Sequence, residues 1–137
     1  MKTLSAEHLI ELLPPNDAVL DQALRRFDLT APALCREPGY CKQLVAEGWT
    51  NPSQINWKGR PAFVVTWHVT SDRGFWLDIA QSLYTGAPTE ALFNAVETLA
   101  RQQNARYIRW LTLRRGLVKL GQRHGYQPEA AVLVKPL

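Results

Sequence analysis

Hydrophobic residues in the first third of the chain recur every three to four positions, which is the spacing of an amphipathic helix. Residues 5–13 and 17–27 each predict a helix, and Asp17 is placed to cap the second one. Residues 30–48 predict helix or loop. The apolar face of the second helix is made by Val19, Leu20, Ala23, Leu24 and Phe27.

The pattern changes in the middle of the chain to short runs rich in β-branched and aromatic residues, which are typical of strands. Residues 54–58, 62–70 and 75–83 predict three strands. The sequence "SDRG" at 71–74 predicts a four-residue turn between the last two. These three segments therefore predict an antiparallel meander.

The helical period returns over residues 88–103, where Pro88 fits the first helical position. Residues 106–113 are apolar on both faces, which is typical of a covered strand. Residues 114–124 predict a helix ended by Gly125. Residues 130–135 predict a last strand.

A meander followed by strand, helix, strand, helix and strand predicts an α/β (α+β) fold with a mixed central sheet covered by helices. A length of 137 residues is that of one domain with a sizeable core. We expect a helical half at residues 1–53 and a sheet half at residues 54–137, without a linker between them.

The composition is that of an ordinary globular chain, with 46% hydrophobic and 20% charged residues. No apolar run reaches about 18 residues, so we expect no membrane-spanning helix. Polar residues interrupt the apolar N-terminal segment, so we expect no signal peptide and a cytoplasmic protein. Cys35 and Cys41 are expected to be free thiols, and the three histidines have no spacing typical of a metal site.

Positive charge is concentrated at the C-terminal end. Residues 100–137 contain eight lysines and arginines but only one acidic residue, Glu129. Arg115, Lys119 and Arg123 are four residues apart and share one helical stripe. Such a stripe is typical of a solvated helix face, and it would also suit phosphate, nucleic acid or an acidic partner.

Asp78 and His68 are the candidate proton acceptors on the predicted strands. If residue 70 pairs with residue 75 across the turn, Asp78 faces Trp67 and the two candidates point to opposite faces of the sheet. They would then not form a pair. Arg109, on an otherwise apolar strand, needs an anionic partner, which would be Asp78 or a phosphate.

The order of elements and the sequence "GLVKLGQRHGYQPEAAVLVKPL" at 116–137, with Gly125-Tyr126 closing its helix, resemble the GCN5-related N-acetyltransferase family. The resemblance covers residues 54–137. It implies an acyl-CoA N-acyltransferase fold, in which residues 54–137 bind acetyl-CoA and residues 1–53 face a small or protein amine acceptor.

In that family a turn of the form Gln/Arg-x-x-Gly-x-Gly/Ala holds the pyrophosphate of acetyl-CoA ahead of the central helix. The sequence "QSLYTGAPTE" at 81–90 matches in two registers. One begins at Gln81 and puts Tyr84 in the place of the first glycine, and the other begins at Leu83 and makes Gly86 that glycine. The residues implied for cofactor binding are Gln81, Leu83, Tyr84, Thr85, Gly86, Ala87, Arg114 and Arg115.

The sequence departs from the family at three positions. Pro88 has no N–H to donate to a phosphate, and Glu90 places a carboxylate in the first turn of the helix. Gly121 stands where many members carry a tyrosine that protonates the departing thiolate. A glycine within a helix costs about 1 kcal/mol relative to alanine, which indicates that a neighbour packs closely there.

Two functions follow from the resemblance. The first is an N-acetyltransferase in which Asp78 accepts a proton from the amine. The alternative is an inactive module of the same fold that binds a protein or, less expected, nucleic acid through its basic C-terminal surface. A homodimer is compatible with both.

Overall fold

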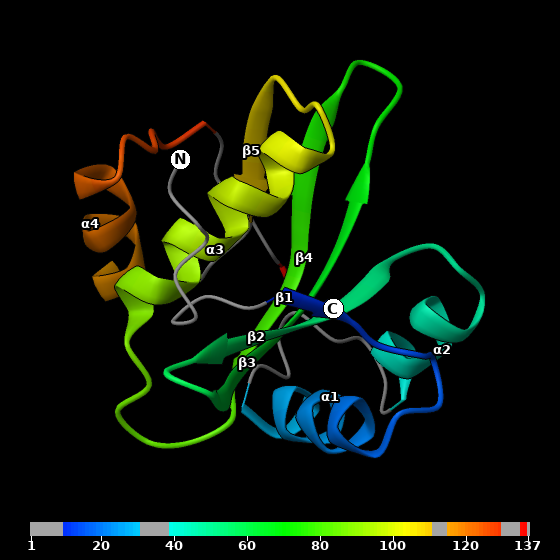
Figure 1. The fold of residues 1–137 in the computed structure, drawn as a ribbon. Coiled ribbons are helices and arrows are strands. Elements are labelled where there is room, and N and C mark those ends of the chain that lie inside the picture. Colours follow the sequence, from blue (N-terminus) through cyan, green and yellow to red (C-terminus); the bar gives the residue numbers. More distant parts are fainter. Residues whose placement is uncertain (1–9, 31–38, 111–114, 130–134, 137) are drawn as a thin grey trace.

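The computed structural model describes residues 10–30, 39–110, 115–129 and 135–136. A mixed sheet runs through the centre of the molecule with helices on both faces (Figure 1). In chain order the elements are β1 (Ile10–Leu12), α1 (Ala18–Thr30), α2 (Tyr40–Ala46), β2 (Asn51–Trp57), β3 (Arg60–Val69), β4 (Gly74–Ser82), α3 (Thr89–Gln102), β5 (Tyr107–Trp110) and α4 (Arg115–Arg123).

The described strands form one sheet in the order β1-β2-β3-β4-β5. The first four are antiparallel neighbours, and β5 is parallel to β4. Parallel neighbours need a crossover connection, which α3 provides. The predicted mixed sheet, with a meander followed by strand, helix and strand, is therefore confirmed.

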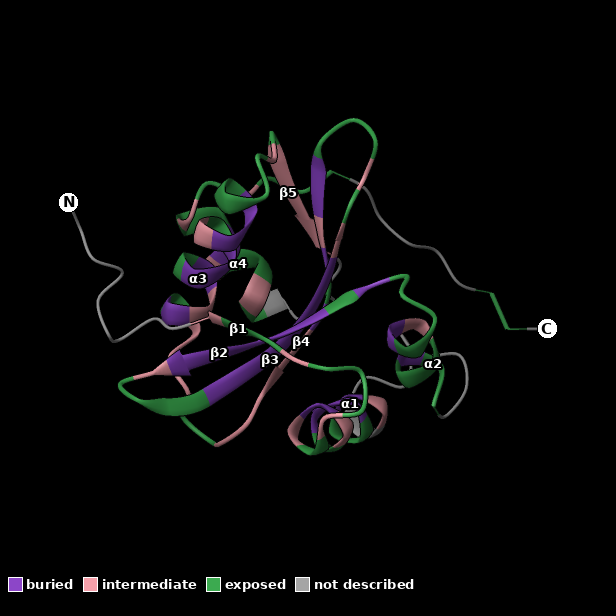
Figure 2. Ribbon diagram, turned by 45° about the vertical axis from the view of Figure 1, so that its right-hand side comes forward, coloured by how far each residue is buried: buried purple, intermediate pink, exposed green. Residues whose placement is uncertain are grey.

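Two hydrophobic cores lie on the two faces of the sheet, and Figure 2 shows the buried residues that follow the central strands. Alternation along β3 sends Phe63, Val65 and Trp67 toward α3, whereas Val64 points to the opposite face. On that opposite face α1 and α2 supply the partners, among them Leu20 and Val45. The first core also takes in the inner face of α3.

The helix predicted over residues 5–13 is wrong where the structure describes it. Residues 10–12 form β1, in which Ile10 pairs with Ile55 of β2, and residues 1–9 lie outside the described part. A three-residue segment has little intrinsic preference, so the free edge of β2 decides its conformation. The sheet consequently has a first strand that the sequence pattern did not indicate.

The other predicted elements agree with the structure within a few residues. The carboxylate of Asp17 accepts hydrogen bonds from the backbone N–H groups of Val19 and Leu20, at 3.0 and 3.1 Å, which confirms the predicted cap. α3 begins one residue after Pro88, which takes the cap position. Residues 130–134 of the predicted last strand lie outside the described part. None of the described helices is long and apolar enough to cross a membrane.

Candidate functional site

A β-bulge interrupts β4 at Asp78. Trp67 of β3 pairs with Leu77, but the next pair is Thr66 with Ile79, which leaves Asp78 as an extra residue without a partner on β3. On the other side of β4, the described pairing with β5 runs from Gly74 to Leu77, which lies opposite Trp110. Asp78 therefore lies where the pairing of β4 with β3 is irregular.

The bulge brings His68 and Asp78 together. Nδ1 of His68 lies 2.7 Å from Oδ2 of Asp78, and the hydroxyl of Thr50 donates to the same oxygen at 2.6 Å. The prediction that the two side chains point to opposite faces is wrong. The turn of the hairpin is one residue longer than predicted, because Val69 rather than residue 70 pairs with Phe75, and the bulge then restores the predicted pairing from Thr66 onward.

An aromatic and charged row crosses the sheet beside this pair. His68 pairs with Trp76, which in turn pairs with Arg109 of β5. The imidazole of His68 stacks on the Trp76 indole with an interplanar angle of 12°. The guanidinium of Arg109 also lies over that indole, 5.5 Å from its centroid.

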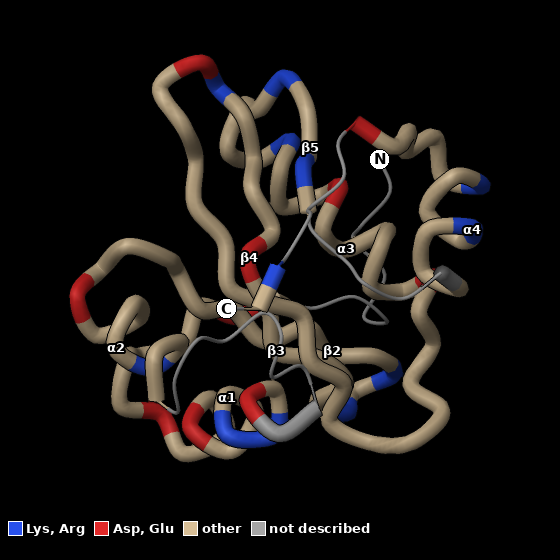
Figure 3. Tube along the Cα trace, turned by 180° about the vertical axis from the view of Figure 1, so that it is seen from behind, with Lys and Arg blue, Asp and Glu red and all other residues tan. Residues whose placement is uncertain are grey.

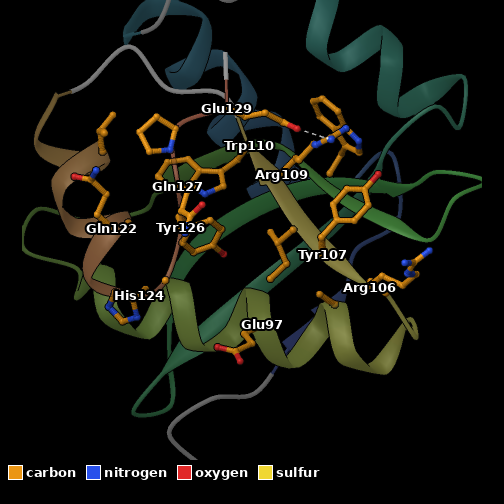
Figure 4. Close-up of a pocket in the computed structure, with 18 of the residues that line it drawn as sticks. Glu97, Arg106, Tyr107, Arg109, Trp110, Gln122, His124, Tyr126, Gln127 and Glu129 are labelled. Carbon is orange, nitrogen blue, oxygen red and sulfur yellow. Dashed lines mark hydrogen bonds and ion pairs between the residues drawn. The ribbon is translucent and has the colours of Figure 1, made fainter. Parts of the chain in front are cut away.

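Arg109 has a different anionic partner from the one predicted. It forms an ion pair with Glu129 at 2.6 Å, drawn as a dashed line in Figure 4, and not with Asp78. Its side chain is 38% exposed, so it is not the buried arginine that the apolar neighbours suggested. Every second residue of β5 faces the open side of the sheet, and Arg109 is one of those.

The face of the sheet that carries this row is open to solvent. It is lined by His68, Thr70, Asp72, Trp76, Asp78, Tyr107 and Arg109. Hydrogen bonds from the hydroxyls of Thr70 and Tyr107 lower the pKa of Asp72, which keeps its carboxylate charged. The open face is thus polar and aromatic, and an amine could approach Asp78 across it.

The turn that follows β4 exposes backbone N–H groups. Thr85 and Gly86 are exposed, and Gly86 has a φ of 83° that favours glycine. Within the described part of the chain, the amides of Thr85, Gly86 and Glu90 donate to no backbone carbonyl. Unpaired amides at the start of a helix attract anions, so this turn has the chemistry of a phosphate site.

Arg60, a residue that the sequence did not single out, lies against this turn. Its guanidinium carbon is 3.6 Å from the centroid of the Tyr84 ring. β3 begins at Arg60 and runs antiparallel to β4, so its start lies next to the end of β4. Figure 3 shows the positive charges at this corner of the sheet and on α4. No motif in the sequence marks Arg60, because its position depends on strand pairing.

Of the other residues implied for cofactor binding, two lie away from the turn residues and two lie at or beyond the edge of the described part. Leu83 packs against the core under α1, on the face opposite α3, and Gln81 pairs with Val64 within the sheet. Arg114 lies outside the described residues, and Arg115 begins α4 with a side chain that is likewise outside the described part. Of the implied set, the turn residues from Tyr84 to Ala87 lie beside the start of α3.

The first turn of α3 carries the two unfavourable features noted in the sequence. Pro88 is the cap residue and has no N–H, and Glu90 is exposed in the first turn. The carboxylate of Glu90 lies 3.8 Å from Nε2 of His124, at the end of α4. His124 is thus close enough to interact weakly with this carboxylate. The carboxylate still adds negative charge beside the turn.

Gly121 is buried because an indole occupies the space beside it. A Cβ at this position would lie 3.2 Å from Trp110 and 3.6 Å from Cβ of Tyr126, which confirms the close packing predicted for this glycine. Burial raises the pKa of Tyr126 to about 12. Its ring contacts Trp110 (Figure 4) and also Phe93, and so belongs to the packing between α3 and β5.

Thr50 is a second residue that the sequence did not indicate. It lies in the connection between α2 and β2 and is only 3% exposed. Its hydroxyl donates a hydrogen bond to Asp78. Trp49 beside it is 69% exposed, so its aromatic surface is available to an acceptor. Among the described residues, no group of three or more His, Cys, Asp or Glu could hold a metal ion.

No protein-family model matches the chain, and no curated protein sequence matches it significantly. Several solved structures do match the chain. The chain has the acyl-CoA N-acyltransferase fold of the GCN5-related N-acetyltransferases. The sequence identities are all low, so the likeness is one of fold.

Three of these structures show how complete the likeness is. A Klebsiella pneumoniae protein assigned to the acyl-CoA N-acyltransferases is 18% identical with a TM-score of 0.66, covering 93% of this chain and 88% of its own. The ribosomal-protein-alanine N-acetyltransferase of Brucella melitensis is 16% identical with a TM-score of 0.64, covering 95% and 99%. AAC(6')-Iy, solved with the bisubstrate analogue CoA-S-monomethyl-acetylneamine, is 12% identical with a TM-score of 0.62, covering 96% and 99%.

Proposed function

We propose that the protein is an acyl-CoA-dependent N-acetyltransferase that transfers an acetyl group to an amine. One observation carries the proposal: β4 links a bulge with a polar pair, His68 and Asp78, to a turn with unpaired backbone amides. The first feature suits a reacting amine, and the second suits a pyrophosphate. Both lie on a fold that this chain shares with acetyltransferases.

The turn is the proposed anchor for acetyl-CoA. The amides of residues 84–87 and the start of α3 would hold its pyrophosphate, and Arg60 would add a positive charge that the turn itself lacks. Bound acetyl-CoA supplies an activated acetyl thioester. Glu90 and Pro88 reduce the number of favourable groups, so we expect a dissociation constant weaker than a complete motif would give.

The spacing along β4 supports this division of roles. Asp78 and Tyr84 are six residues apart, and a strand advances about 3.3 Å per residue, which gives a span of roughly 20 Å. An extended pantetheine arm bridges a separation of that order. The thioester would then come close to the bulge while the phosphates stay at the turn.

Amines are the acceptor class that the fold neighbours support. The names of two of them refer to a ribosomal-protein alanine and to an acetylneamine analogue, and both are amine compounds. On this chain the open face beside Asp78, with the exposed Trp49 near it, is the proposed acceptor side. The acceptor is expected to be a primary amine that reaches the bulge from solvent.

Titration with acetyl-CoA tests the proposal. At a hundredfold excess over the dissociation constant, the bound form is expected to be about 2.7 kcal/mol more stable than the free form in a thermal-shift or calorimetric experiment. Arg60→Ala should weaken binding about tenfold or more, because it removes a charge-assisted contact. Arg25→Ala on α1, an exposed arginine that pairs with Asp21, is the matched control and should bind as the wild type does.

Turnover is then measured as release of free CoA thiol in the presence of a panel of primary amines. Release that depends on the amine supports the transferase. No stabilisation at millimolar acetyl-CoA overturns the proposal and leaves the alternative of a binding module. Binding without turnover for any amine would likewise favour the non-catalytic alternative.

A further inference from the structure

Oδ2 of Asp78 is the acceptor of two hydrogen bonds, one from the hydroxyl of Thr50 and one from Nδ1 of His68. A carboxylate only accepts hydrogen bonds, so Nδ1 of His68 carries the proton of this contact. In the neutral imidazole the other nitrogen, Nε2, then holds a free lone pair. The contact thus selects the tautomer in which Nε2 can accept a proton.

Nε2 is also accessible. The His68 side chain is 37% exposed, against 24% for Asp78, and His68 lines the open face. Within the described residues Nε2 has no hydrogen-bond partner, whereas Asp78 Oδ2 already has two. An amine that arrives from solvent therefore finds a free acceptor at Nε2 of His68, whereas Oδ2 of Asp78 already accepts two hydrogen bonds.

Two further contacts fix the orientation of the imidazole. Its ring is nearly parallel to the Trp76 indole, with 6.1 Å between the centroids. Thr50, which is almost fully buried, holds the carboxylate that in turn holds Nδ1. A buried hydroxyl, a carboxylate and an aromatic face together place one imidazole at the bulge.

We propose that His68 is the proton acceptor for the amine, and that Asp78 and Thr50 are positioning residues that act through it. The assignment rests on the proposed acetyl transfer and moves the proton-accepting role from Asp78 to its neighbour. An ammonium group loses one proton to Nε2 of His68, which becomes imidazolium and later returns the proton to solvent. The neutral amine nitrogen forms the N–C bond as the C–S bond breaks, and its second proton neutralises the departing thiolate.

Charged groups from each neighbouring strand face His68. Asp78 on β4 and Asp72 in the hairpin turn are acidic. Arg109 on β5, whose guanidinium lies over the Trp76 ring and pairs with Glu129, is basic. Tyr107 lines the same face, and Thr50, from the connection before β2, is neutral.

His68→Gln is the first test, measured as kcat, KM and the dissociation constant of acetyl-CoA. Gln keeps a polar side chain near Asp78 but has no basic nitrogen. Loss of a general base costs about 10²- to 10⁴-fold in kcat, with acetyl-CoA affinity unchanged. The defect should shrink at high pH, where the amine loses its proton without help. Imidazole added to His68→Gly should restore part of the rate, which no purely structural role explains.

Asp78→Asn and Thr50→Val should reduce kcat less than His68→Gln, because they disturb only the orientation of the imidazole. Asp21→Asn, at a half-buried carboxylate on α1 that pairs with Arg25 and Lys42, is the matched control and should leave the rate unchanged. Wild-type turnover by His68→Gln together with loss of activity in Asp78→Asn would overturn the assignment and make Asp78 itself the base. A wild-type protein that neither binds acetyl-CoA nor turns over would instead overturn the proposed function.

Discussion

The bulge in the middle of β4 and the turn that follows β4 build their functional groups in different ways. At the bulge, side chains from three segments meet: Thr50 before β2, His68 on β3 and Asp78 on β4 are joined by hydrogen bonds. At the turn after β4, the available groups belong to the backbone, and within the described part the amides of Thr85 and Gly86 have no backbone acceptor.

The difference shows which kind of substitution the bulge and the turn will each tolerate. The hairpin and bulge depend on side-chain packing and register, so a small steric or polar change there displaces partners. The turn depends on the local conformation of a few residues, so its sequence can vary as long as the φ angles and the open space remain. The predictions that follow test this contrast, and they begin with the largest expected effect.

Gly74→Ala tests the packing at the hairpin end. A Cβ on this residue would lie 2.3 Å from the Tyr107 hydroxyl, so the ring must move and release its 2.5 Å hydrogen bond to Asp72. We expect a loss of about 1–3 kcal/mol in the free energy of unfolding, measured by urea denaturation. The loss should be smaller in a Tyr107→Ala background. Gly116→Ala, where a Cβ meets nothing within 4 Å, is the control and should be neutral or stabilising.

Gly86→Val tests the conformation of the turn. A Cβ here meets no neighbour, so the cost comes from the φ of 83° alone, about 1–2 kcal/mol in the free energy of unfolding. Gly86→Asn should cost less, because asparagine tolerates this region of backbone conformation. Equal effects of the two variants in urea denaturation would show that packing rather than backbone conformation decides this position.

Glu90→Gln tests the charge beside the turn. Removing a carboxylate from the first turn of α3 should favour a bound anion by about 0.3–1 kcal/mol, which is up to about fivefold in the dissociation constant of acetyl-CoA. The gain should fall at high salt. Glu97→Gln, further along α3 and paired with Arg101, should change nothing. Unchanged binding by the Glu90 variant would mean that its carboxylate does not face the anion, and weaker binding would mean that the carboxylate contributes to binding.

The smallest expected effect is a change in the pKa of Asp72, because this carboxylate is exposed to solvent. Its pKa is lowered first by the Thr70 hydrogen bond and next by that of Tyr107. A lowered pKa stabilises the fold above the unfolded-state value, and this contribution is lost as the pH falls through the folded-state value. Thr70→Val should raise the pKa of Asp72 more than Tyr107→Phe does, as followed by NMR titration. A pKa that stays unchanged in both variants would contradict this account.

Much of the fold was predictable from local patterns. The helix after the turn, the three strands of the meander and the cap at Asp17 follow from periodicity and from residues with strong local preferences. Gly121 could even be assigned a close neighbour, because glycine within a helix is costly. β1 could not be predicted, since a three-residue strand exists only through its partner.

The candidate site was predictable only in part. The turn was singled out because glycine and proline mark it and because it resembles a family motif, and Asp78 because an amine needs a proton acceptor near the strand. The pairing of Asp78 with His68 was missed, since a bulge leaves no signal in the residues that make it. Thr50 and Arg60 were missed for a related reason: each reaches its partner across a strand pair. Cofactor binding, self-association and cellular compartment stay predictions.

By itself the sequence determined most of the described elements and their order, with β1 as the exception, because helix and strand periods and turn residues act over a few neighbouring positions. Only the tertiary structure decided that β4 bulges at Asp78 and that His68, Thr50 and Asp78 share one oxygen. The physical reason is that register depends on the sum of contacts along whole strands. A shift by one residue reverses the face of every side chain, so the candidate chemistry of this protein depends on a single extra residue in one strand.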